Sequence, residues 1–112
     1  MEEYVDRTIQ AVQEKWSSSE VYALGHIADG NIHFFVRPNV GPASVSLHQT
    51  CDALMYKALK KYNGSISAEH GIGIEKKQWL SQSRSGNEIS LMKGLKRTLD
   101  PEKILNPGRV FD

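Results

Sequence analysis

Cysteine is almost absent from this 112-residue chain, and the single Cys51 limits the chemistry that can be expected. One cysteine excludes an internal disulfide and a metal cage built from cysteines. Cys51 falls on the apolar face of a predicted helix, where a thiol more often packs as a small hydrophobic group than reacts as a nucleophile. The sequence therefore predicts a structural role for this side chain.

Long apolar runs and an excess of one charge are also lacking. No stretch approaches the roughly 20 apolar residues of a membrane-spanning helix, and the acidic start at Glu2 and Glu3 is unlike a signal peptide. The net charge is +1, and the basic residues are spread along the chain, which argues against a nucleic-acid surface. We expect a soluble, unprocessed chain that forms one domain or part of one.

Hydrophobic periodicity divides the first half of the chain into two helices and a hairpin. Helical spacing covers 3–16 and 43–62. Alternating spacing over 20–37 predicts two strands, with Asp29 and Gly30 as a two-residue hairpin turn between them.

The second half is predicted to hold a short strand over 65–68, a short helix near Ile74 and a last helix. Ser85 and Glu88 have capping-box spacing and mark the start of the last helix, which ends before Pro101. It is expected to turn Met92, Leu95 and Leu99 inward, and the tail after it is expected to be anchored by Ile104 and Leu105. This order of elements predicts the α+β class, with helices covering a small, mostly antiparallel sheet whose exposed edge favours a fragment or a chain that pairs with another.

Two histidines on the hairpin are candidates for a shared site. If Asp29 and Gly30 form the turn, His26 lies directly opposite His33, and both imidazoles point away from the core at a distance that suits one metal ion. Ile27 would then face the core together with Ile32, Phe34 and Val36. The alternative is that both are ordinary surface histidines.

A carboxylate and a third histidine follow at Glu69 and His70. Two histidines and one carboxylate leave coordination positions open, as a catalytic divalent metal requires. Glu69 and His70 can reach one pocket only if the backbone turns there, which Gly71 and Gly73 permit. The alternative is an exposed glycine-rich turn. No further glycine continues a dinucleotide-binding pattern, and His48 is expected at the surface or its boundary.

Three segments in order resemble the C-terminal domain of FAD-linked oxidases. They are GHIADGNIH over 25–33, SISAEHGIG over 65–73, and LDPEKILNPG over 99–108. Members of this family include cytochrome-type D-lactate dehydrogenases, the flavin subunit of glycolate oxidase, and D-2-hydroxyglutarate dehydrogenases. The resemblance runs from about Val21 to Val110.

This resemblance implies a fold and a role for each site residue. Residues 1–112 would be the C-terminal part of the substrate (cap) domain, an incomplete ferredoxin-like α+β domain. His26, His33 and Glu69 would bind a divalent metal, with zinc expected. His70 would take a proton from the hydroxyl of a 2-hydroxy acid while hydride passes to FAD, and Asn106 would contact the flavin side.

The resemblance also implies that the FAD-binding domain is a partner outside this sequence. The chain alone would then be inactive, and could self-associate through its severed interface. The parent protein would be a cytoplasmic FAD-dependent oxidoreductase, or one attached peripherally to a membrane.

Two positions depart from the family pattern. Ala28 stands where glycine is common, and Phe35 stands where some members carry asparagine, which favours a D-lactate-like substrate over a dicarboxylate. Two other readings stay open: a stand-alone metal-binding or dimerising α+β module without redox activity, and a small metallohydrolase that uses the same side chains.

Overall fold

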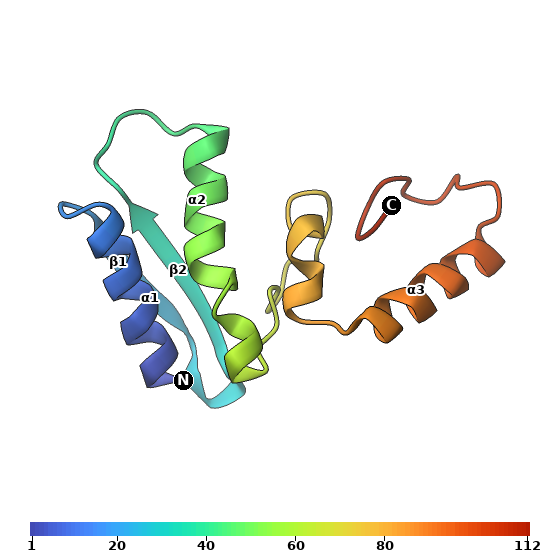
Figure 1. Cartoon of the computed structure of the whole chain (residues 1–112), viewed down its shortest axis with the longest axis horizontal. Coiled ribbons are helices and arrows are strands. Elements are labelled where there is room, and N and C mark those ends of the chain that lie inside the picture. Colours follow the sequence, from blue (N-terminus) through green and yellow to red (C-terminus); the bar gives the residue numbers. More distant parts are fainter. The chain divides into compact units, whose positions relative to one another are not determined.

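The computed structural model describes residues 1–112, which form two compact units, 1–62 and 63–112. Each unit is described by itself (Figure 1). No helix in the chain combines the length and the apolar character that a membrane crossing would require.

The first unit consists of two helices and one hairpin. An antiparallel sheet of two strands confirms the α+β class, and α1 and α2 lie beside the hairpin in Figure 1. The elements are α1 (Glu2–Lys15), β1 (Glu20–His26), a 3₁₀ turn (Ile27–Asp29), β2 (Asn31–Arg37), α2 (Val45–Tyr56) and a second 3₁₀ turn, η2 (Leu59–Tyr62).

The core of this unit lies under α1. Val12 and Thr8 are fully buried one helical turn apart, and the Thr8 hydroxyl donates to the Tyr4 carbonyl at 2.8 Å. The Tyr4 ring makes edge-on contacts with Phe34 of β2 and with Tyr62, and its hydroxyl donates to the carbonyl of Met55 in α2 at 2.8 Å. Burial raises the pKa of Tyr4 to about 12. One aromatic side chain thus ties α1 to the sheet and to α2.

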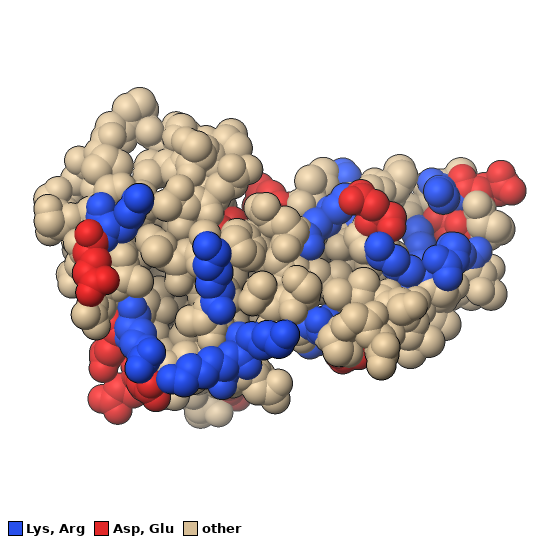
Figure 2. All heavy atoms as spheres, in the orientation of Figure 1, with Lys and Arg blue, Asp and Glu red and all other residues tan.

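Charged side chains of both signs share the surface of each unit, as Figure 2 shows for one face. Glu3 is 3.1 Å from the Arg7 guanidinium and 3.2 Å from the Lys61 ammonium, and its pKa lies below its usual value chiefly because Lys61 donates to it. Such exposed pairs contribute little to stability. Cys51 is half-buried, and this burial raises the pKa of its thiol, which favours the unreactive protonated form.

The second unit contains one long helix, α3 (Gly86–Leu99), preceded by a 3₁₀ helix, η3 (Lys77–Gln82). The predicted capping box is confirmed: the Ser85 hydroxyl accepts from the Glu88 amide at 3.2 Å, and the Glu88 carboxylate accepts from the Ser85 amide at 2.7 Å. The Ser85 amide and then the Ser85 hydroxyl donate to the Glu88 carboxylate, which holds the pKa of Glu88 below its usual value.

Three sequence predictions are wrong in this unit. Residues 65–68 form no strand, so the chain has two strands instead of three. The side chains of Leu95 and Leu99 are 54% and 77% exposed instead of facing inward, and only Met92 is half-buried. Ile104 and Leu105 are exposed too. The periodicity of α3 identified an apolar stripe correctly, but two of its three predicted members, Leu95 and Leu99, stay exposed.

We expect Ser85→Ala to destabilise the second unit by about 1 kcal/mol, because the first-turn amide of Glu88 loses its acceptor. Urea unfolding followed by Trp79 fluorescence in a Trp16→Phe background would measure it. Ser90→Ala, an exposed substitution inside the same helix, is the control and should have little effect. An equal loss in both variants would contradict the role of the cap.

Candidate active site

The hairpin register differs from the predicted one, with consequences for both histidines. Ile27, Ala28 and Asp29 wind into a 3₁₀ turn, and Gly30 follows in the left-handed region at φ 70°. The connection therefore has four residues instead of two, and Asn31 becomes the partner of His26. The prediction of a two-residue turn is wrong because the local turn takes in Ile27, whose side chain is 75% exposed instead of facing the core.

The corrected register moves the two histidines apart along the strands but keeps them on one face. His33 pairs with Leu24, so His26 and His33 are diagonal neighbours instead of a direct pair. A register shift of two residues preserves the face of every side chain, because strand side chains alternate with a period of two. Diagonal neighbours have Cα atoms about 7–8 Å apart, which long side chains can still bridge.

This face of the hairpin, here called the histidine face, is open to solvent. Its members alternate along both strands and include exposed aromatic and aliphatic groups: Tyr22, Leu24, His26, Asn31, His33 and Phe35. The opposite face carries Val21, Ala23, Ile32, Phe34 and Val36, all half-buried. The sequence prediction that both imidazoles point away from the core is therefore confirmed for the face they occupy.

Glu69 and His70 lie on a turn of the second unit, and their side chains point to the same side. The Glu69 Oε2 and the His70 Nε2 are 3.9 Å apart. Gly71 and Gly73 adopt left-handed φ angles of 75° and 54°, which turn the chain just after the pair. The condition for a shared pocket, a backbone turn at these glycines, is thus met.

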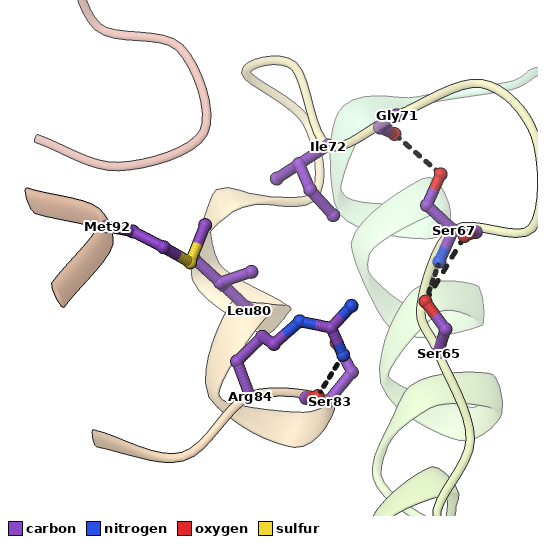
Figure 3. A pocket seen from close by; sticks show the side chains of 8 residues that line it. All are labelled: Ser65, Ser67, Gly71, Ile72, Leu80, Ser83, Arg84 and Met92. Atoms are coloured by element: carbon purple, nitrogen blue, oxygen red, sulfur yellow. Dashed lines mark hydrogen bonds between the residues drawn. The ribbon is translucent and has the colours of Figure 1, made fainter. Parts of the chain in front are cut away.

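A shallow hollow of about 220 Å³ adjoins this turn (Figure 3). Leu80 is buried and, with Met92, lies across the hollow from Ser65 and Ser67. The remaining lining residues are Gly71, Ile72, Ser83 and Arg84. No acidic side chain lines it, and Arg84 places a guanidinium at its rim, with Nη1 donating to the Ser83 carbonyl at 2.7 Å.

The residues named for a metal come from both units. His26 and His33 belong to the first unit, whereas Glu69 belongs to the second. The structure assembles no group of three or more His, Cys, Asp or Glu side chains that could hold a metal ion. The donor set, two imidazoles and a carboxylate, nevertheless matches the ligand types of catalytic zinc sites.

Asn106, the residue expected on the flavin side, lies in a turn after α3. It is exposed and adopts a left-handed φ of 45°, and its carbonyl accepts from the Arg109 amide at 3.4 Å. His48 is exposed on α2, as predicted, and its imidazole lies 3.6 Å from the buried carboxylate of Asp52.

Sequence reasoning missed the part that Asp100 plays in this turn. Asp100 is only 4% exposed, and its side chain accepts from the amides of Ile104 and Leu105 at 3.0 and 3.1 Å and from the Lys96 ammonium. Lys96 also donates to the Leu105 carbonyl. The sequence showed only an Asp-Pro pair that ends the helix. The clue available was the spacing of Lys96 and Asp100, four residues apart on a helix.

The Asp100 turn should open in acid. Hydrogen bonds from Lys96 and the two amides lower the pKa of Asp100 below its usual value. The contribution of the ionised Asp100 to the stability of this turn is therefore complete above the ordinary carboxyl pKa of about 4. It is lost as the pH falls through the lower folded-state pKa. The protection factors of the Ile104 and Leu105 amides, taken from NMR exchange rates relative to the unstructured rate at each pH, should fall only at the acid end of the range from about pH 6 to pH 2. Protection factors that stay constant over this range would contradict this, and Asp100→Asn should remove the transition.

Comparison with known proteins places this α+β chain in a class of flavin-linked oxidoreductase domains. Residues 1–110 match the family described as FAD linked oxidases, C-terminal domain. The chain therefore belongs to the FAD-linked oxidase C-terminal domain family, as the three sequence segments predicted.

Three of the relatives found among curated proteins carry the name D-2-hydroxyglutarate dehydrogenase. A D-2-hydroxyglutarate dehydrogenase of Xanthomonas citri pv. viticola is 39% identical over 115 aligned positions, which cover 100% of this chain and 24% of the relative. One from Stutzerimonas stutzeri is 40% identical over 103 residues, 89% of this chain and 22% of the relative. The mitochondrial enzyme of Bos taurus is 40% identical over 95 residues, 85% of the chain and 17% of the relative. The chain thus spans a quarter or less of the length of these relatives.

Proposed function

We propose that this chain forms the substrate side of an FAD-dependent D-2-hydroxy-acid dehydrogenase. The observation that carries the proposal is the Glu69–His70 pair, whose Oε2 and Nε2 atoms lie 3.9 Å apart on a glycine-containing turn. The chain that holds this pair matches the FAD-linked oxidase C-terminal domain over residues 1–110. The match supports a flavin-binding domain as the partner of this chain, and the names of the relatives support a 2-hydroxy acid as the substrate.

His70 is the residue proposed to move a proton. An imidazole titrates near neutral pH and can accept the proton of the substrate hydroxyl as the carbon that carries it loses hydride. When bound, FAD supplies the acceptor for that hydride, so the 2-hydroxy acid leaves as the 2-oxo acid. The neighbouring carboxylate of Glu69 lies 3.9 Å from the imidazole Nε2. Asn106 is proposed to contact the flavin side.

His26, His33 and Glu69 are proposed as ligands of a divalent metal, with zinc the expected ion. The proposal rests on the donor types and on the family segments that contain them. When bound, the ion supplies a positive charge that polarises the substrate hydroxyl. The shared histidine face gives two of the three donors a common direction.

Titration calorimetry with zinc or manganese tests the ligand set. One ion should bind per chain, and binding should be lost in His26→Ala and in His33→Ala but kept in the matched control His48→Ala. Binding that survives both hairpin substitutions, or an absence of binding to the unchanged chain, would contradict a metal site assembled by these residues within the chain.

Two observations point to different 2-hydroxy acids. The relatives' names favour D-2-hydroxyglutarate, a dicarboxylate. Phe35, 57% exposed on the histidine face, offers an apolar surface that favours D-lactate. Comparing kcat/KM for the two acids, in the parent protein and in its Phe35→Asn variant, decides between them: an increase for the dicarboxylate alone would assign Phe35 to substrate selection.

The exposed apolar surfaces support self-association of the isolated chain. Leu91, Leu95 and Leu99 follow one another at four-residue spacing along α3 and are all more than half exposed. Sedimentation velocity over a range of concentrations would detect it.

A further inference from the structure

The turn that carries Glu69 and His70 is closed at its base by one side chain. The Ser67 hydroxyl donates to the Gly71 carbonyl at 2.8 Å, a bond drawn in Figure 3. The four residues from Ala68 to Gly71 therefore form a ring that is fastened at Ser67 Oγ. Glu69 and His70 are both exposed within this ring, so few packing contacts are available to fix their backbone.

Other polar groups fix Ser67 itself. The Lys76 ammonium donates to the Ser67 hydroxyl oxygen at 3.4 Å, so that oxygen accepts from a cation while its proton is directed to Gly71. A hydroxyl that accepts a charged hydrogen bond is polarised and becomes a better donor. The Ser65 hydroxyl donates to the Ser67 carbonyl at 3.2 Å and accepts from the Ser67 amide at 3.4 Å. Ser67 and Lys76 are half-buried, which limits competition from water.

The far end of the turn is fastened by backbone bonds. The Lys76 amide donates to the Ile72 carbonyl at 3.2 Å, and the Val110 amide donates to the Gly73 carbonyl at 2.8 Å. Backbone after His70 is therefore held by regular turns and by the C-terminal segment, whereas backbone at the base of the ring depends on a serine hydroxyl.

We propose that Ser67, held by Lys76, is a positioning residue that sets the direction of the Glu69 and His70 side chains. This inference deepens the proposed function, on which its catalytic meaning rests. Loss of the bond to the Gly71 carbonyl would free the backbone angles of Gly71, which join His70 to the fixed backbone at Ile72, so the backbone of His70 could then rotate. Ser67 would act only through that backbone, without contact with the substrate.

The first test measures the turn directly in the whole 112-residue chain by NMR. In Ser67→Ala, the NMR order parameters of the amides over 68–71 should fall, because the bond that closes the turn is lost, and the His70 ring resonances should shift. Ser67→Thr keeps the hydroxyl and should restore the original order parameters. The matched control is Ser83→Ala, because Ser83 lines the same hollow but lies outside the 68–71 ring.

Unchanged order parameters in Ser67→Ala, or an equal change in Ser83→Ala, would overturn the proposal. If Ser67→Ala does not fold, Lys76→Met serves in its place, since it removes the ammonium but leaves the serine. The order parameters over 68–71 should fall in that variant too, and no fall would overturn the arrangement.

The second test separates this inference from the proposed function. In the flavin-containing protein, Ser67→Ala should lower kcat about fivefold with KM unchanged, and Ser67→Thr should recover it. If that protein oxidises no 2-hydroxy acid at all, the proposed function fails while the NMR result still decides whether Ser67 sets the turn. A rise in KM alone would overturn the positioning role.

Discussion

Replacing His70 by glutamine is expected to lower kcat about 10²–10⁴-fold in the protein that joins this chain to its flavin domain. Glutamine has a similar reach but cannot accept a proton near neutral pH, so the hydroxyl proton would have no base. Anaerobic stopped-flow measurement of flavin reduction isolates this step from reoxidation. The binding of substrate should change little, because the loss concerns the reacting proton.

His48→Gln is the matched control, because His48 is an exposed histidine on α2 beside Asp52 and far in sequence from all three family segments. It should leave the rate of flavin reduction unchanged. A His70→Gln protein that reduces flavin at the original rate would remove His70 from the mechanism.

Gly25→Ala is expected to cause the largest loss of stability in the first unit, about 3 kcal/mol. Gly25 pairs with Ile32 at the closed end of the hairpin. A Cβ atom there would lie 2.1 Å from the Asn31 carbonyl oxygen, which belongs to the backbone and cannot move without opening the strand pair. Urea unfolding monitored by Trp16 in a Trp79→Phe background would measure it. Because His26 follows Gly25 directly, zinc binding through the hairpin should weaken as well.

A second glycine provides a control of opposite sign. Gly94 lies inside α3, where an added Cβ meets nothing within 4 Å, so Gly94→Ala should stabilise that helix by about 1 kcal/mol. Equal effects of the two substitutions would show that the close approach at Gly25 does not decide hairpin stability.

The sequence predicted those elements whose signals are local. The capping box at Ser85 and Glu88 needs only two side chains and a helix start, and the structure contains both of its hydrogen bonds. The length of the hairpin turn was missed because an Asp-Gly pair fits a two-residue turn and also the end of a 3₁₀ turn, and the choice depends on Ile27.

Predictions that depended on packing against or pairing with another element failed more often. The stripe on α3 was read as a core face, although Leu95 and Leu99 are more than half exposed. Ser65–Ala68 has strand-like alternation, but no partner strand pairs with it, and Ser67 instead donates to the Gly71 carbonyl in the turn. At the candidate site, the motif identified His26, His33, Glu69 and His70, while Ser67 and Asp100 became visible only through their hydrogen bonds.

The most direct test of the account is anaerobic mixing of the flavin-containing protein with D-2-hydroxyglutarate and, separately, with D-lactate, while the flavin absorbance is recorded. The account predicts that at least one of these acids bleaches the oxidised flavin band and yields one 2-oxo acid per flavin, and that the L enantiomers do not. A flavin that stays oxidised with both D acids, in a protein shown to hold FAD, would contradict the proposed dehydrogenase function.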